Sequence, residues 1–74
     1  MEDSIKAIMA DIFMIDTGSI DQQSSMDTIE RWDSLAHIDL VAALEEEFGF
    51  AFEVEEFESM TSYSEIVRVV NAKQ

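Results

Sequence analysis

The 74-residue chain contains no cysteine and no proline, and glycine occurs only twice. The absence of cysteine excludes disulfide bonds, thiolate zinc sites, iron–sulfur clusters and a thiol nucleophile provided by the protein itself. Because turns between strands depend on glycine and proline, the scarcity of both disfavours a turn-rich β fold. Basic residues are also scarce, since four Lys and Arg stand against 17 Asp and Glu, which gives a net charge of −13. Such a charge repels phosphate backbones and anionic lipid head groups, so we expect neither a nucleic acid nor a membrane as a partner.

The chain is apolar enough to fold despite this charge. Hydrophobic residues make up 47% of it, which is too many for a disordered acidic tail. The length suits one small domain, which we place at residues 1–74. No apolar run approaches the ~20 residues of a membrane span, and the acidic start does not resemble a basic signal peptide. These properties predict a small, monomeric, all-α domain located in the cytoplasm.

Apolar residues at a helical spacing predict a first helix, which is followed by a long polar loop. The helical residues are Ile5, Ile8, Met9, Ile12 and Phe13. The loop begins near residue 16 and spans about fifteen residues, where ~4–6 are typical, so it is a candidate for function. Its apolar residues are expected to pin it to the core: Ile20, Met26, Ile29 and Trp32. The indole nitrogen of Trp32 then requires a hydrogen-bond partner.

The second helix is expected between the cap Asp33-Ser34 and the stop signal Gly49. Its apolar stripe is predicted to comprise Leu35, Ile38, Val41, Ala42, Leu44 and Phe48. A lone histidine on a helix is usually solvated, and we expect this of His37. Core packing is the expected role of the methionines Met9, Met14, Met26 and Met60.

The remainder of the chain predicts an extended link, a short helix and a final helix. The link covers residues 50–54, and the short helical turn lies near residues 55–59. The last helix is expected to begin at Thr61 or Ser62, with its inner face formed by Tyr63, Ile66, Val67 and Val70. The resulting fold class is a small four-helix bundle of three longer helices and one short one.

Few side chains could support catalysis. The chain has one histidine, no glycine-rich phosphate loop and no carboxylate spacing that matches a calcium-binding loop. We therefore expect that it is not an enzyme. The start of the second helix is different, because free amides and the positive end of the helix dipole there would favour a phosphodiester on the hydroxyl of Ser34. Taken alone, however, Asp33-Ser34-Leu35 is more often a simple helix cap.

Three segments in and before the second helix carry a resemblance to a known family. They are Trp32-Asp33-Ser34-Leu35, Ile38-Asp39-Leu40-Val41 and Ala43-Leu44-Glu45-Glu46-Glu47-Phe48-Gly49. Together they closely resemble the prosthetic-group segment of acyl carrier proteins. A weaker resemblance extends through Glu55-Glu56-Phe57 and Met60-Thr61-Ser62 into the last helix.

This resemblance implies a four-helix bundle in which Ser34 carries a 4′-phosphopantetheine arm, transferred from coenzyme A by a phosphopantetheinyl transferase. The arm would supply the thiol that the sequence lacks and hold acyl groups as thioesters for acyl-transferring synthases and modifying enzymes. In this family such enzymes use basic patches to dock on the acidic second helix. The docking positions implied here are Asp33, Leu35, Asp39, Glu45, Glu46 and Glu47.

Several residues depart from the pattern of fatty-acid carriers, so the pathway stays open. Ala36 stands where an acidic residue is usual, and Phe52-Glu53 replaces a frequent Ile-Pro. Trp32 is more similar to stand-alone carriers of polyketide or modified-lipid assembly. Carriers of aminoacyl or D-alanyl groups remain alternatives. In a different class, a non-carrier acidic helical adaptor would bind a basic partner surface and use Ser34 only as a cap.

Overall fold

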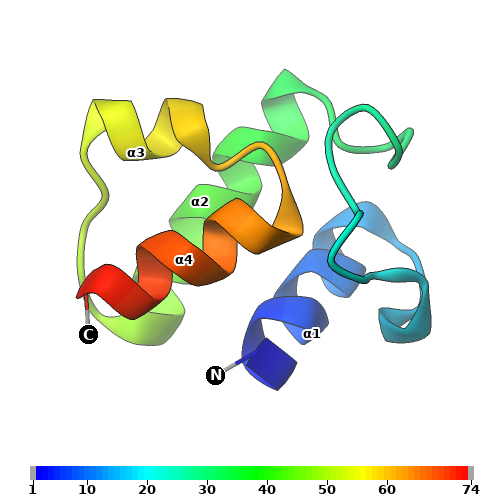
Figure 1. Cartoon of the computed structure of the whole chain (residues 1–74), viewed down its shortest axis with the longest axis horizontal. Helices are drawn as coiled ribbons and strands as arrows, with labels where there is room; N and C mark the ends of the chain where they lie inside the picture. Colours follow the sequence, from blue (N-terminus) through cyan, green and yellow to red (C-terminus); the bar gives the residue numbers. More distant parts are fainter. Residues whose placement is uncertain (1, 74) are drawn as a thin grey trace.

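Four α-helices make up the described part of the chain, residues 2–73 of a computed structural model (Figure 1). They are α1 (Glu2–Phe13), α2 (Ser34–Phe48), α3 (Val54–Ser59) and α4 (Tyr63–Lys73), with a short 3-10 turn, η1 (Thr17–Ser19), after α1. Within these residues there is no β-strand, only an isolated bridge between Ser25 and Ser62. The predicted all-α bundle, with three longer helices, one short helix and a long loop before α2, is confirmed.

The ends of α2 are determined by local hydrogen bonds, as the sequence predicts. Asp33 has an extended backbone, and its Oδ1 accepts a hydrogen bond from the Ala36 amide at 2.9 Å. At the other end, Gly49 has a left-handed backbone with a φ of 76°, and its amide donates to the carbonyl of Glu45 at 2.9 Å. Glycine suits this position because a side chain would be strained at that φ.

The long loop between α1 and α2 is attached to the bundle at several points. Three of its four expected apolar anchors are buried, and the fourth, Met26, is half-buried. The Met26 amide donates to the carbonyl of Thr61, and the Tyr63 amide donates to the carbonyl of Ser24, both at 2.9 Å. In Figure 1 the loop lies on the right of the view, next to the beginning of α2, whereas α3 lies on the left. The loop is therefore an ordered part of the end of the molecule that contains Ser34.

α2 turns a different face to the core than the predicted stripe. Its buried residues are His37, Leu40, Val41 and Leu44. Leu35 and Ile38 are instead 71% and 53% exposed, and Ala42 is exposed as well. The sequence places apolar side chains on more than one arc of this helix, and packing against α1 buries the arc that contains Leu40 and Leu44. Leu35 and Ile38 are thereby left on the surface close to Ser34.

Two smaller predictions also need correction. Met9 and Met60 are buried as expected, but Met14 is 74% exposed, because the chain leaves α1 there through a left-handed residue with a φ of 58°. On α4 the structure buries Val69, whereas Val67 is only half-buried. The link that follows α2 is extended, and the short helix α3 appears close to its predicted position.

Candidate functional site

Ser34 is the first residue of α2, and it is exposed. The neighbouring Asp33 caps the helix, since its side chain accepts from the Ala36 amide and its carbonyl accepts from the His37 amide. Within residues 2–73, the amides of Ser34 and Leu35 have no hydrogen-bond acceptor. A hydroxyl, two free amide donors and the positive end of a 15-residue helix therefore meet at one exposed point. A phosphodiester anion attached to this hydroxyl fits that environment.

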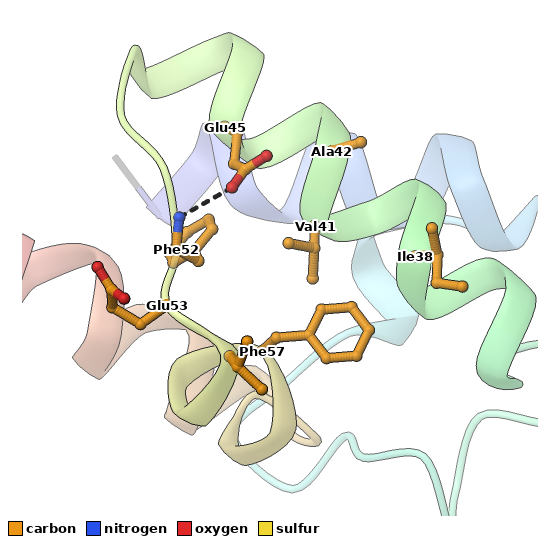
Figure 2. Close-up of a pocket in the computed structure, with 8 residues that line it drawn as sticks. Ile38, Val41, Ala42, Glu45, Phe52, Glu53 and Phe57 are labelled. Carbon is orange, nitrogen blue, oxygen red and sulfur yellow. Dashed lines mark hydrogen bonds between the residues drawn. The ribbon is translucent and has the colours of Figure 1, made fainter.

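A mostly apolar groove of about 320 Å³ lies between α2 and α3. It is lined by Ile38, Val41, Ala42 and Glu45 of α2, by Phe52 and Glu53 of the link, and by Val54 and Phe57 of α3. Figure 2 shows the side chains of Ile38 and Val41 on one side of this groove and the ring of Phe57 on the other. Because Ile38 follows Ser34 by four residues, the two side chains share one side of α2. The groove is therefore accessible from the side of the helix that presents Ser34.

The acidic side chains of the predicted docking surface fall into two groups. Those exposed to solvent are Asp33, Asp39, Glu46 and Glu47. Glu45 is half-buried, and its Oε2 accepts a hydrogen bond from the Phe52 amide at 2.8 Å, the dashed line in Figure 2. The ion pairs formed within residues 2–73 lie on α3 and α4, so none neutralises an acidic residue of α2. From the sequence, all of these carboxylates are assigned the same docking role. In the structure Glu45 also forms part of the groove wall.

His37 is buried, contrary to the expectation that it is solvated. It is only 4% exposed, and Trp32 Nε1 donates to its Nδ1 at 3.0 Å. On the other side of the ring, His37 Nε2 lies 2.8 Å from the carbonyl oxygen of Phe57. Two hydrogen bonds compensate the imidazole for its lost hydration, which is why burial is tolerated. The expected partner of the Trp32 indole is thus found. The helical spacing of His37 with Leu40 and Leu44 is the sequence signal that indicates its burial.

Comparison with known proteins agrees with this geometry. The family model described as "Phosphopantetheine attachment site" matches residues 3–70. An acyl carrier protein of Thermosynechococcus vestitus is 32% identical over 71 residues, which cover 96% of this chain and 88% of that protein. An acyl carrier protein of Clostridium acetobutylicum is 36% identical over 70 residues, with 95% and 91% covered. The chain belongs to the acyl carrier protein family.

Membership in this family establishes the general role of the chain. It is a carrier and not an enzyme, and its cofactor is a covalently attached 4′-phosphopantetheine. Acyl carrier proteins work with partner enzymes of acyl biosynthesis. A solved structure from Mycobacterium tuberculosis, provisionally assigned as an acyl carrier protein, has the same fold: the TM-score is 0.88 over 99% of this chain and 97% of that one, at 23% identity. Within residues 2–73, no helix has the length and apolar character needed to cross a membrane.

Proposed function

We propose that Ser34 is the attachment residue. In this proposal the protein shuttles acyl intermediates as thioesters between enzymes of fatty-acid, polyketide or related lipid biosynthesis. The main supporting observation is the exposed Ser34 at the first position of α2, inside the matched residues 3–70. A phosphopantetheinyl transferase can reach its hydroxyl, and the free amides of Ser34 and Leu35 can donate to phosphate oxygens. When bound, the arm supplies the terminal thiol that this cysteine-free chain lacks.

The groove between α2 and α3 favours an acyl cargo over an aminoacyl cargo. Its walls are mostly apolar, and covering an alkyl chain with them is favourable by roughly 0.8 kcal/mol per buried CH₂ group. An aminoacyl or D-alanyl group carries an ammonium, whose burial against Val41 and Phe57 would be unfavourable. Two carboxylates also line the groove, those of Glu45 and Glu53, and that of Glu45 accepts a hydrogen bond from the Phe52 amide. The groove therefore suits an apolar chain sheltered beside Ser34.

Partner enzymes are proposed to dock on α2 around Ser34 with basic surfaces. The proposed docking residues are Asp33, Leu35, Asp39, Glu45, Glu46 and Glu47. Complementary charge accelerates and orients such an encounter more than it adds affinity. The exposed Leu35 offers an apolar contact next to the attachment point. Because α1, α2 and α4 share one hydrophobic core, we infer that residues 1–74 act as one monomeric carrier domain.

The attachment residue is tested by replacing Ser34 and weighing the protein. The unmodified chain is incubated with coenzyme A and a broad-specificity phosphopantetheinyl transferase, and its intact mass is measured. The wild type should gain one phosphopantetheinyl group and Ser34→Ala none. Because the cap is provided by Asp33, Ser34→Ala should keep the helical circular dichroism spectrum of the wild type.

A matched control is Ser19→Ala, which removes another exposed serine hydroxyl from the turn η1. This variant should be modified as fast as the wild type. Modification of Ser34→Ala, or a folded wild type that gains no mass, would contradict the proposed attachment residue.

A further inference from the structure

Four aromatic rings form a row through the end of the molecule that contains Ser34. The row begins with Phe13 of α1, whose ring centroid is 5.0 Å from that of Trp32 in the loop. Trp32 is followed by His37 of α2 at 6.0 Å, and His37 by Phe57 of α3 at 4.7 Å in an edge-to-face arrangement. His37 is three residues after Ser34, so this row connects α1, the loop and α3 at the first turns of α2.

The hydrogen bonds of His37 determine where its proton lies. The indole Nε1–H of Trp32 can only donate, so Nδ1 of His37 must accept and carry no proton. The proton of the neutral ring is then on Nε2, which donates to the carbonyl oxygen of Phe57. Each nitrogen of the imidazole therefore has a defined task. One nitrogen holds the loop and the other holds α3.

The bond to Phe57 matters because α3 cannot hold its own position. It has only six residues, and isolated helices of that length are not stable in water. Its contacts with the rest of the chain include the Lys73–Glu56 ion pair at 3.0 Å and the bond from His37 to Phe57. Phe57 also lines the groove opposite Val41, so the position of α3 sets the width of the groove at that point.

We propose that His37 is a positioning residue that fixes α3 against α2 and thereby determines how well an acyl chain is sheltered in the groove. The sheltering of an acyl chain rests on the proposed function. The restraint on α3 does not, because the hydrogen bond from His37 to Phe57 exists in the unmodified protein. The hydrogen-bond partners of the His37 ring are Trp32 and Phe57, and the hydroxyl of Ser34 is not one of them. His37 acts through Phe57, which forms the α3 wall of the groove together with Val54.

Two conservative replacements separate the two tasks of the ring. In His37→Gln the side-chain nitrogen can reach the former place of Nε2 and donate to Phe57, while the contact with Trp32 is lost. In His37→Asn the side-chain oxygen can occupy the former place of Nδ1 and accept from Trp32, while the contact with Phe57 is lost. The pair is therefore matched in chemistry and differs in which hydrogen bond survives.

The first readout is amide hydrogen exchange of residues 54–60 in the unmodified protein. His37→Asn should exchange roughly fivefold faster than the wild type there, the size expected for one lost hydrogen bond, and His37→Gln should stay close to the wild type. The second readout is the cleavage rate by hydroxylamine of an octanoyl thioester on the arm. It should rise in His37→Asn and be rescued in His37→Gln. Val69→Ala, which weakens the core within α4, controls for general destabilisation.

Equal exchange and equal cleavage in the two His37 variants would overturn the proposal, as would values in His37→Asn no faster than in the wild type. If neither the wild type nor the variants accept the arm, the proposed attachment fails, while the exchange data still decide whether His37 restrains α3.

A further measurement uses the wild type alone. The chain has one histidine, so its ¹⁵N chemical shifts report the tautomer directly. A protonated Nε2 and a bare Nδ1 are expected, and the opposite tautomer would overturn the proposal.

Discussion

At the scale of single residues, burial gives chemically ordinary side chains particular roles. His37 is the clearest case, because two hydrogen bonds turn a polar ring into part of the core. Tyr63, the first residue of α4, is a second case. It is buried, and its hydroxyl donates to Glu2 Oε1 at 3.1 Å, which ties α4 to the first turn of α1. Both side chains join segments that are distant in the sequence.

The environment of Tyr63 predicts a loss of stability at alkaline pH. Burial, and then the hydrogen bond and negative charge of Glu2, raise the pKa of Tyr63 from 10.0 to about 12. Because the pKa is higher in the folded chain, the resulting stabilisation is complete below pH 10.0 and is lost as pH rises through about 12. The chain has one tyrosine, so phenolate absorbance measures this titration directly.

The control for this titration is Tyr63→Phe, which should lack both the absorbance change and the Tyr63 contribution to the alkaline loss of stability. Circular dichroism recorded at each pH shows whether the protein is still folded. A phenolate that forms near its ordinary pKa while the helices remain intact would contradict the prediction.

At the scale of the elements, α3 and the link before it depend on contacts with other parts of the chain. The start of α3 has a local cap, in which the Glu53 amide donates to Glu56 Oε1 at 2.7 Å. This hydrogen bond from Glu53, with a smaller effect of Lys73, holds the pKa of Glu56 below its ordinary value. The link is fastened to α2 by the bond from the Phe52 amide to Glu45. Glu45 therefore stabilises the groove wall and is also part of the acidic surface of α2.

Charge reversal at Glu45 and Glu46 should separate these two roles. Both Glu45→Lys and Glu46→Lys should slow modification by a transferase with a basic docking surface, because both weaken electrostatic steering. Only Glu45→Lys removes the acceptor of the Phe52 amide, so only this variant should lose about 1 kcal/mol of unfolding free energy. Urea denaturation measures the stability, and the initial rate of mass gain measures docking.

The two variants carry the same change in net charge, so each is the control for the other. Equal unfolding free energies would mean that the Glu45–Phe52 bond does not stabilise the link. Unchanged modification rates in both variants would place the docking surface elsewhere on the molecule.

At the scale of the whole molecule, the charge of −13 is concentrated in a small volume. The described residues extend over only 26 × 23 × 19 Å, and their ion pairs are limited to Arg68–Glu65 and Lys73–Glu56. Most carboxylates therefore repel one another without a basic neighbour. The Debye length is about 30 Å at 0.01 M salt, longer than the molecule, so the repulsion acts across the whole fold.

Added salt should therefore raise the melting temperature. Between about 0.01 M and about 0.15 M sodium chloride the Debye length falls to about 8 Å, and most long-range repulsion is screened. A gain of about 1 kcal/mol corresponds to a rise of roughly 4–8 °C for a domain of this size. Calorimetry of the wild type and of the less acidic double variant Glu46→Gln/Glu47→Gln tests this. The variant should show the smaller rise, and a flat wild-type curve would contradict the prediction.

Local signals in the sequence were sufficient for the helices and for the placement of Ser34. The cap at Asp33 and the left-handed Gly49 act through hydrogen bonds that span three or four residues, so they can be read without knowledge of the fold. The apolar spacing that predicts the helices is equally local. Ser34 at the start of α2, with free amides beside it, follows from these same signals.

The sequence by itself determined which segments are helical, where α2 begins and the family of the chain. Only the tertiary structure decided which arc of α2 is buried, that His37 belongs to the core, and that Glu45 differs from Glu46. The physical reason is that these properties depend on partners at a distance. α1 selects the buried arc, Trp32 and Phe57 satisfy the imidazole, and the Phe52 amide reaches only one of two adjacent carboxylates.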